Sequence, residues 1–302
     1  MHLDPYIILG SAVVGLLVGM TGAGGGALMT PMLILLFGVT PSSAISSDLV
    51  AAVLMRPIGA AVHIRAGTVN FKLVRWLVTG SVPAAFLGAY LLHLMHGSPN
   101  AQTNIEYFLG AALLVGAAAM VLRFAIDRRS GRRYASLDEI EPRPIPTLIV
   151  GIVGGVIVGL TSVGSGSLMV IALLFLYPMI GANQLVGTDL TQAVPLTLAA
   201  ACGALIFGHV EFGVTGSLII GSVPAVFLGS LLSSSVPDKY VRPVIAFVIY
   251  ASGLKYVQIP TQTLGWVLCG TLLGCGGAWM AYARPWQRLP GATSEEPAAP
   301  DR

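Results

Sequence analysis

Long runs of apolar residues, separated by short polar segments, make up most of the chain. Several runs reach the roughly 20 residues that a helix needs to cross a bilayer. We expect each run to form a helix, so the pattern predicts an all-α polytopic membrane protein. The runs cover residues 5–20, 27–38, 43–64, 74–95, 104–124, 145–160, 168–178, 184–207, 214–233, 240–257 and 262–283.

Composition excludes a soluble domain. Hydrophobic residues make up 55% of the chain and charged residues only 10%, with a mean hydropathy of +0.83. Soluble domains carry about 25% charged residues. The chain begins MHLDPY, with no basic residue before the first apolar run, so we expect that run to belong to the mature protein and not to a cleaved signal peptide.

The sequence contains an internal repeat. GMTGAGGGALM at 19–29 matches GLTSVGSGSLM at 159–169 at six of eleven positions, and GSVPAAFLG at 80–88 matches GSVPAVFLG at 221–229 at eight of nine. Between these anchors SSDL corresponds to GTDL, at a similar offset of about 140 residues. We therefore expect two copies of one membrane unit. The predicted parts are repeat 1 at 1–124, a charged cytoplasmic linker at 125–144, repeat 2 at 145–257, an extra span at 258–283 and a disordered polar tail at 284–302.

The distribution of Lys and Arg predicts opposite orientations for the two copies. Arg65, Lys72 and Arg75 follow the third run, and six arginines lie in and beside the linker. The positive-inside rule places both segments in the cytoplasm and leaves no role for nucleic acid as a partner of this basic cluster. The corresponding copy-two loop, FGHVEFGV, has neither Lys nor Arg and should lie outside. This is an inverted-topology repeat in a multi-pass protein of the cell membrane, with the N-terminus outside and the C-terminus cytoplasmic.

Each copy begins with an apolar segment that glycines interrupt. Residues 5–38 would form a single helix about 51 Å long, which exceeds one span and falls short of two. The segment at 145–178 has the same length. We expect each to be a broken helix pair, with TGAGGG or TSVGSGS at the break and a new helix starting at about Ala27 and Ser167. Whether each pair crosses the membrane twice or re-enters as a hairpin is left open, because both arrangements return the chain to the side on which it started.

Paired breaks of this kind are the best sequence pointer to a transporter's substrate site. A helix that starts inside the protein presents free N–H groups and a positive dipole end, which favour an anion. The alternative is that the glycines only permit close helix crossing. A dinucleotide fingerprint is excluded, because no strand precedes the glycines. The candidate substrate-binding residues at the breaks are Thr21, Gly22, Gly24, Gly25, Gly26, Thr161, Ser162, Gly164, Ser165, Gly166 and Ser167.

Ionisable groups in the runs after the breaks are further candidates, since such groups are costly in lipid. Arg56 could neutralise an anionic substrate or pair with an aspartate. Asp48, Asp189 and His63 are candidates for coupling or gating, although each aspartate could instead cap a helix and His63 could extend to the interface. Gln192 joins the candidate binding residues, because with its polar neighbours it makes copy two the more polar wall of any cavity.

We expect no metal or cofactor. Cys202, Cys269 and Cys275 lie in apolar runs, and their spacing matches no zinc or haem pattern. Packing in the protein core is the expected role of these cysteines.

With these motifs in hand, the chain resembles the TauE/SafE family, the toluene-sulfonate uptake permeases. The resemblance rests on GMTGAGGGALMTPMLI with SSDL, on GLTSVGSGSLM with GTDL, and on the twin GSVPA segments, and covers about residues 8–283. It implies a secondary transporter, often an exporter, of sulfite, organosulfonates or related anions. The implied partners are a small anion, the lipid bilayer and H⁺ or Na⁺ as a coupling ion, with the oligomeric state open.

Two other functions compete with a transporter. Broken helices also build selectivity filters, so an anion channel stays possible. Two aspartates at equivalent intramembrane positions could share a proton, as in an intramembrane aspartyl protease. Such proteases resemble one another in a GxGD sequence, whereas this chain has SSDL and GTDL. We therefore expect no enzymatic activity.

Overall fold

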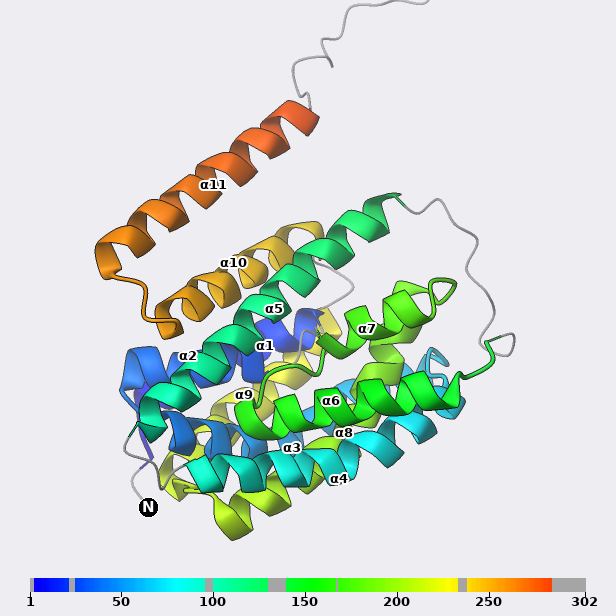
Figure 1. Ribbon diagram of the computed structural model, residues 1–302, viewed down its shortest axis with the longest axis horizontal. Coiled ribbons are helices and arrows are strands. Elements are labelled where there is room, and N and C mark those ends of the chain that lie inside the picture. Colours follow the sequence, from blue (N-terminus) through cyan, green and yellow to red (C-terminus); the bar gives the residue numbers. More distant parts are fainter. Residues whose placement is uncertain are drawn as a thin grey trace, which may run out of the picture. The chain divides into compact units, whose positions relative to one another are not determined.

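A computed structural model describes residues 3–21, 25–95, 100–129, 140–166, 168–232 and 238–283. These residues form eleven α-helices (Figure 1). The helices are α1 (Pro5–Thr21), α2 (Gly26–Phe37), α3 (Pro41–Arg65), α4 (Phe71–Met95), α5 (Ala101–Arg129), α6 (Pro144–Thr161), α7 (Leu168–Leu176), α8 (Ala182–Phe207), α9 (Phe212–Leu232), α10 (Asp238–Tyr256) and α11 (Thr261–Ala283).

Every predicted apolar run forms one of these helices, so the prediction of an all-α polytopic membrane protein is confirmed. Six helices are long and apolar enough to cross a membrane among the residues described. The surface agrees with a lipid environment, because large apolar side chains such as Leu36 and Ile206 are 75% and 65% exposed. Polar side chains such as Asp48 and Gln192 are instead buried.

Both long apolar segments are interrupted where the glycines predict. The helix α1 ends at Thr21 and α2 begins at Gly26, one residue before the expected start. In the second copy α6 ends at Thr161 and α7 begins at Leu168, one residue after the expected start. Breaks of similar length therefore stand at equivalent places in the two copies.

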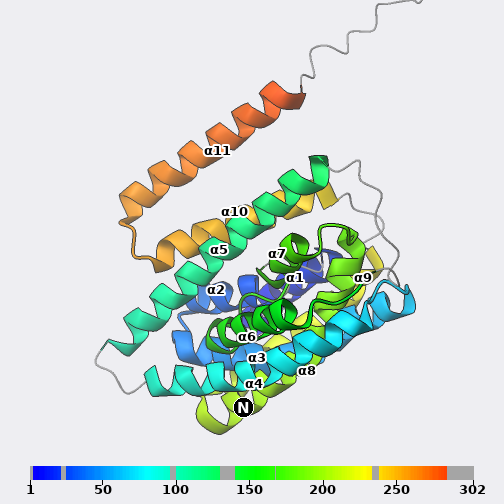
Figure 2. The same ribbon diagram turned by 45° about the vertical axis from the view of Figure 1, so that its right-hand side comes forward.

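Residues 1–259 form one compact unit, and α11 belongs to a second unit, residues 260–302, that is described only by itself. Within the first unit the two sequence copies interleave. The helix α4 of copy one packs along α6 of copy two, and α9 of copy two packs along α1 of copy one. The pair α3 and α8 lies between them, and α5 lies beside α10 (Figure 2). Neither copy therefore folds around a core of its own.

The two interleaved helix pairs meet through equivalent glycines. A Cβ atom added at Gly80 in α4 would lie 2.6 Å from the carbonyl oxygen of Leu148 in α6. At the equivalent place in the other pair, a Cβ atom at Gly221 in α9 would lie 2.2 Å from the carbonyl oxygen of Ile8 in α1. Both contacts need glycine, because a methyl group would overlap the neighbouring backbone. The inverted orientation of the two copies stays a prediction.

The expected packing of the cysteines in the core is wrong for the two described as free thiols. Cys202 and Cys269 are both exposed on their helices. A small, weakly polar thiol is compatible with lipid as well as with a core. An apolar run alone does not distinguish the two environments.

Candidate functional site

The two breaks meet inside the first unit. A Cβ atom added at Gly26, the first residue of α2, would lie 1.8 Å from the carbonyl oxygen of Ser162. The residue Ser162 caps α6 in a left-handed conformation (φ 58°), and its N–H donates to the carbonyl of Val158 over 2.7 Å. The start of α2 therefore packs directly on the end of α6. Three candidate residues of the breaks, Gly22, Gly24 and Ser167, lie outside the described residues.

The glycines of the second break are required by the backbone. Gly164 and Gly166 have φ values of 127° and 94°, in the region that side chains with a Cβ atom rarely adopt. The threonines that precede the breaks hydrogen bond to their own helices: Thr21 and Thr161 each donate a hydroxyl to the carbonyl four residues earlier, over 2.7 Å. These contacts give the break residues structural roles and leave their predicted contact with a substrate untested.

Asp48 joins the first copy to the second break. Its Oδ2 atom accepts hydrogen bonds from the hydroxyls of Thr30 in α2 (3.0 Å) and Ser162 (2.7 Å). The side chain is 1% exposed, seven residues inside α3, whose N-cap is Thr40. Asp48 thus does not cap its helix, and its side chain is enclosed by protein.

Arg56 lies two turns further along α3 and is also buried. Its Nη1 atom donates to the hydroxyl of Ser165 in the second break. The guanidinium is also attracted electrostatically by the carboxylates of Asp189 and Asp48. The two expected roles of Arg56, an aspartate partner and a group available to an anion, are therefore compatible.

Asp189 and Gln192 form a second polar group on α8. The Nε2 atom of Gln192 donates to Oδ1 of Asp189 over 3.1 Å and contacts the sulfur of Met169 at 2.7 Å. Its Oε1 atom accepts from the hydroxyl of Ser81 in α4 over 3.1 Å. Protein groups therefore occupy both ends of the Gln192 amide.

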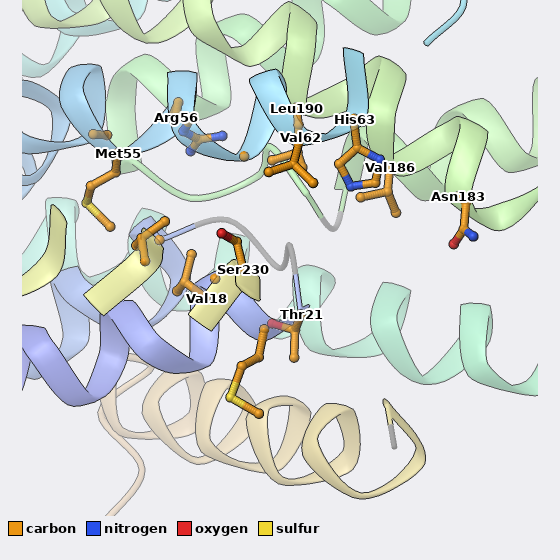
Figure 3. Close-up of a pocket in the computed structure, with 16 residues that line it drawn as sticks. Val18, Thr21, Met55, Arg56, Val62, His63, Asn183, Val186, Leu190 and Ser230 are labelled. Atoms are coloured by element: carbon orange, nitrogen blue, oxygen red, sulfur yellow. The ribbon is translucent and has the colours of Figure 1, made fainter. Parts of the chain in front are cut away.

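A pocket of about 150 Å³ borders Arg56 (Figure 3). Arg56, Val62 and His63 of α3 form one wall, and Val18, Thr21 and Ser230 face them from α1 and α9. The His63 Nδ1 atom lies 2.9 Å from the Thr68 hydroxyl. Other lining residues include Gly25, Met55, Asn183, Val186 and Leu190.

The pocket brings together only part of the predicted site. It is lined by Thr21, Gly25, Arg56 and His63 among the candidates. The candidates of the second copy, Gln192 included, are not among its lining residues as far as the chain is described. We expected copy two to supply the more polar wall of a cavity; in this pocket copy one supplies Thr21, Arg56 and His63, and copy two supplies Asn183 and Ser230.

Sequence reasoning missed several residues of this region. Asn183, Val186 and Leu190 share one face of α8, spaced by three and four residues, and a search for such a face leading to Asp189 could have found them. Thr30 could have been found as a hydroxyl in the otherwise apolar helix after the first break. Nothing in the sequence singles out Met55 or Ser230.

Comparison with known proteins identifies the family of this chain. A sequence profile described as "Sulfite exporter TauE/SafE" matches residues 7–256, which include both breaks and the pocket. This chain belongs to the TauE/SafE family. The family resemblance predicted from the glycine motifs is confirmed.

Relatives of this TauE/SafE protein occur in Bacillus subtilis (strain 168). The chain is 41% identical to the "Probable membrane transporter protein YjnA" over 252 residues, which are 83% of this chain and 98% of the relative. It is 26% identical to the "Probable membrane transporter protein YdhB", over 68% of this chain and 80% of that protein. No solved structure matches the chain. The TauE/SafE protein described here is thus a multi-pass membrane protein of a transporter family.

Proposed function

We propose that this protein is a secondary transporter that moves a small anion across the cell membrane, with the anionic group of the substrate bound at Arg56. The observation that carries the proposal is a buried guanidinium at the wall of a pocket beside the first helix break. A charge at this depth is costly and is functional by default. The planar guanidinium can bind two oxygen atoms of one oxyanion at once.

The first break adds to the attraction. Gly25 lines the pocket beside Arg56 and directly precedes α2. The amino-terminal end of a helix carries free N–H groups and a partial positive charge. Of the two breaks, the first therefore supplies the anion cradle, whereas the second supplies the hydroxyl that holds Arg56.

The family supports a proposal for the chemical class of the substrate. Its description names sulfite export, so a sulfur-containing anion, such as sulfite or an organosulfonate, is the proposed cargo and export the proposed direction. Transport would proceed by alternating access around the pocket, with the interleaved copies as moving parts. In the proposed topology the pocket lies on the cytoplasmic side of Arg56, because it extends toward His63 and Arg65 follows at the end of α3.

A thermal-shift screen of the purified protein tests this proposal. The panel is sulfite, thiosulfate, sulfoacetate, taurine, carboxylates and halides, and an anion that binds the folded state must raise the melting temperature. Counterflow in proteoliposomes then distinguishes a carrier from a channel, since only a carrier shows it. If no anion in the panel shifts melting, or if the flux shows no counterflow, the proposal is wrong.

The variant Arg56→Lys tests the role of the guanidinium. Lysine keeps the charge and loses the planar fork. We expect affinity for the active anion to fall about tenfold or more, since a charge-assisted hydrogen bond contributes about 1.5–3 kcal/mol. Arg75→Lys is the matched control, because Arg75 is exposed on α4. Unchanged affinity in Arg56→Lys and Arg56→Ala would place the anion elsewhere.

A further inference from the structure

The hydrogen bonds of the Asp48 carboxyl group are not explained by anion binding at Arg56. Its Oδ2 atom accepts two hydroxyl hydrogen bonds, whereas its Oδ1 atom is buried and has no hydrogen-bond partner. An unpaired carboxylate oxygen shielded from solvent is costly. A proton on this carboxyl group would remove that cost.

The equivalent aspartate of copy two is held differently. Asp189 accepts a hydrogen bond from the amide of Gln192, three residues later on α8. The position in copy one that corresponds to Gln192 is Ala51, which has no donor. The repeat therefore gives an amide donor to one aspartate of the pair and none to the other. The donors to Asp48 are hydroxyls that both contact Oδ2, so its buried Oδ1 atom would keep no donor in the ionised form.

The charges around Arg56 link Asp48 to the anion. In the described part of the chain, Arg56 is attracted by both Asp48 and Asp189, so these three ionised groups already carry more negative than positive charge. An anion arriving at Arg56 adds a further negative charge in a low-dielectric region. Neighbouring like charges in such a region cannot all stay ionised without a large cost in free energy. Anion binding should therefore favour protonation of Asp48.

We propose that Asp48 is a proton-binding site coupled to the anion site, so that each anion binds together with a proton. This rests on the proposed function, in that the anion must bind at Arg56. The coupling is reciprocal: a lower pH strengthens anion binding, and the bound anion strengthens proton binding. The two then cross the membrane together.

A proton suits this place better than a metal cation. Asp48 does not line the described pocket, and Thr30 and Ser162 already occupy one of its oxygens. A hard cation needs room and several oxygen ligands, whereas a proton needs neither. Na⁺ is therefore treated as the competing outcome of the test.

Few other groups near Asp48 can titrate. The helices α2, α6 and α9, which pack on α3 or meet it at the breaks, contain no Asp, Glu, Lys, Arg or His. On α8 the acidic group is Asp189, and on α5 the described acidic group, Glu106, acts on Tyr256 of α10. On α3 itself, beyond Arg56, the next titratable side chain is His63, on the pocket wall. The loop between α8 and α9 also packs on α3, since the Glu211 N–H donates to the Ser47 hydroxyl, and it carries His209 and Glu211. His63, His209 and Glu211 are thus the groups that must be separated from Asp48 experimentally.

The first arm of the test measures binding of methanesulfonate, which stays ionised over the whole range from mildly acidic to mildly alkaline pH. In the parent protein the affinity should rise by up to about tenfold per pH unit of acidification, the limit for one linked proton. In Asp48→Asn, which mimics the neutral acid, the affinity should lose its pH dependence. Glu106→Gln is the matched control and should keep it.

Three outcomes of this arm would overturn the proposal. The first is a pH dependence that persists in Asp48→Asn. The second is a pH dependence that disappears in His63→Gln, His209→Gln or Glu211→Gln and persists in Asp48→Asn. The third is an affinity for methanesulfonate that changes when choline replaces Na⁺ and does not change with pH.

A second arm needs no variant. Titration calorimetry with methanesulfonate in two buffers of different ionisation enthalpy reports the protons taken up per anion bound. We expect uptake of up to about one proton, as linkage at a single site requires. No uptake by a protein that binds methanesulfonate would overturn the proposal even if Asp48→Asn does not fold.

A third arm separates failure of the proton site from failure of the anion site. Without any anion, melting temperatures of the parent and of Asp48→Asn are compared across the same pH range. A buried carboxyl that must lose its proton destabilises the fold as pH rises, so the melting temperature of the parent should fall relative to that of Asp48→Asn. If methanesulfonate does not bind but the difference in melting temperature between Asp48→Asn and the parent increases with pH, only the anion site is wrong. A difference that stays constant rejects the proton site.

Discussion

At the scale of single residues, two adjacent glycines in the first break should respond differently to the same change. A Cβ atom at Gly26 would overlap the carbonyl of Ser162, which is rigid backbone. At Gly25 the nearest atom would be the terminal methyl group of Met55, 3.3 Å away and easily displaced. Gly25 also has a right-handed conformation that alanine can adopt. One glycine is therefore needed for packing and its neighbour is not.

We predict that Gly26→Ala lowers the stability of the protein by about 1–3 kcal/mol, the usual range for forced overpacking. Gly25→Ala should leave the melting temperature in detergent nearly unchanged and weaken anion binding, because its methyl group would enter the pocket. Melting curves and binding of the active anion measure the two effects. Equal destabilisation by both substitutions would contradict this division of roles.

These two glycines also show how far residue-level prediction from sequence extends. The TGAGGG string predicts a break because glycine is a poor helix former. It does not show which glycine faces a ligand and which faces backbone, since that depends on a segment 136 residues away, Ser162 against Gly26. For the same reason, the sequence indicates that Arg56 and Asp48 are costly in lipid, but not that both bind hydroxyls of the second break.

At the scale of helices, the interleaved pairs should be equally sensitive to added methyl groups. Gly155 of α6 meets the carbonyl of Ser81 in α4, and its equivalent Gly15 of α1 meets the carbonyl of Ser222 in α9. An added Cβ atom would lie 2.5 Å and 2.8 Å from these oxygens. Small residues let helix backbones approach closely, and a methyl group prevents it.

We predict that Gly155→Ala and Gly15→Ala each destabilise the protein by about 1–3 kcal/mol. Gly270→Ala in α11 is the control, because a Cβ atom there meets nothing within 4 Å. Thermal melting in detergent measures the effect. Loss of stability in only one member of the pair would show that the two contacts are not equivalent.

Helices themselves were predictable and their partners were not. Apolar runs bounded by polar residues gave the position of each helix to within a few residues, because lipid requires both an apolar surface and internal hydrogen bonding. The stripe Gly80–Gly88 indicates that α4 has a close neighbour. It does not say that the neighbour is α6 of the other copy, since small residues specify the distance between two helices and not the identity of either.

At the scale of the whole molecule, the distribution of Lys and Arg predicts which side of the membrane the pocket faces. The pocket extends from Arg56 past His63 to Asn183, at the end of α3 and the start of α8. Arg65 is the last residue of α3, and Lys72 follows at the start of α4. We therefore predict that the pocket faces the cytoplasm, where an exporter must collect its substrate.

The topology is tested with single cysteines in a background that lacks the three native cysteines. We predict that Ala66→Cys, after α3, and Ser136→Cys, in the linker, are protected from a membrane-impermeant thiol reagent added to intact cells, because the positive-inside rule predicts that both segments are cytoplasmic. His209→Cys, in the loop that corresponds to Ala66 in copy two, should be labelled under the same conditions. Ala66 and His209 are both exposed, so a difference in labelling reports sidedness and not burial. Labelling of both loops from the same side would exclude the inverted repeat. Labelling of Ala66→Cys and Ser136→Cys from outside would mean that the pocket faces the exterior, which favours uptake over export.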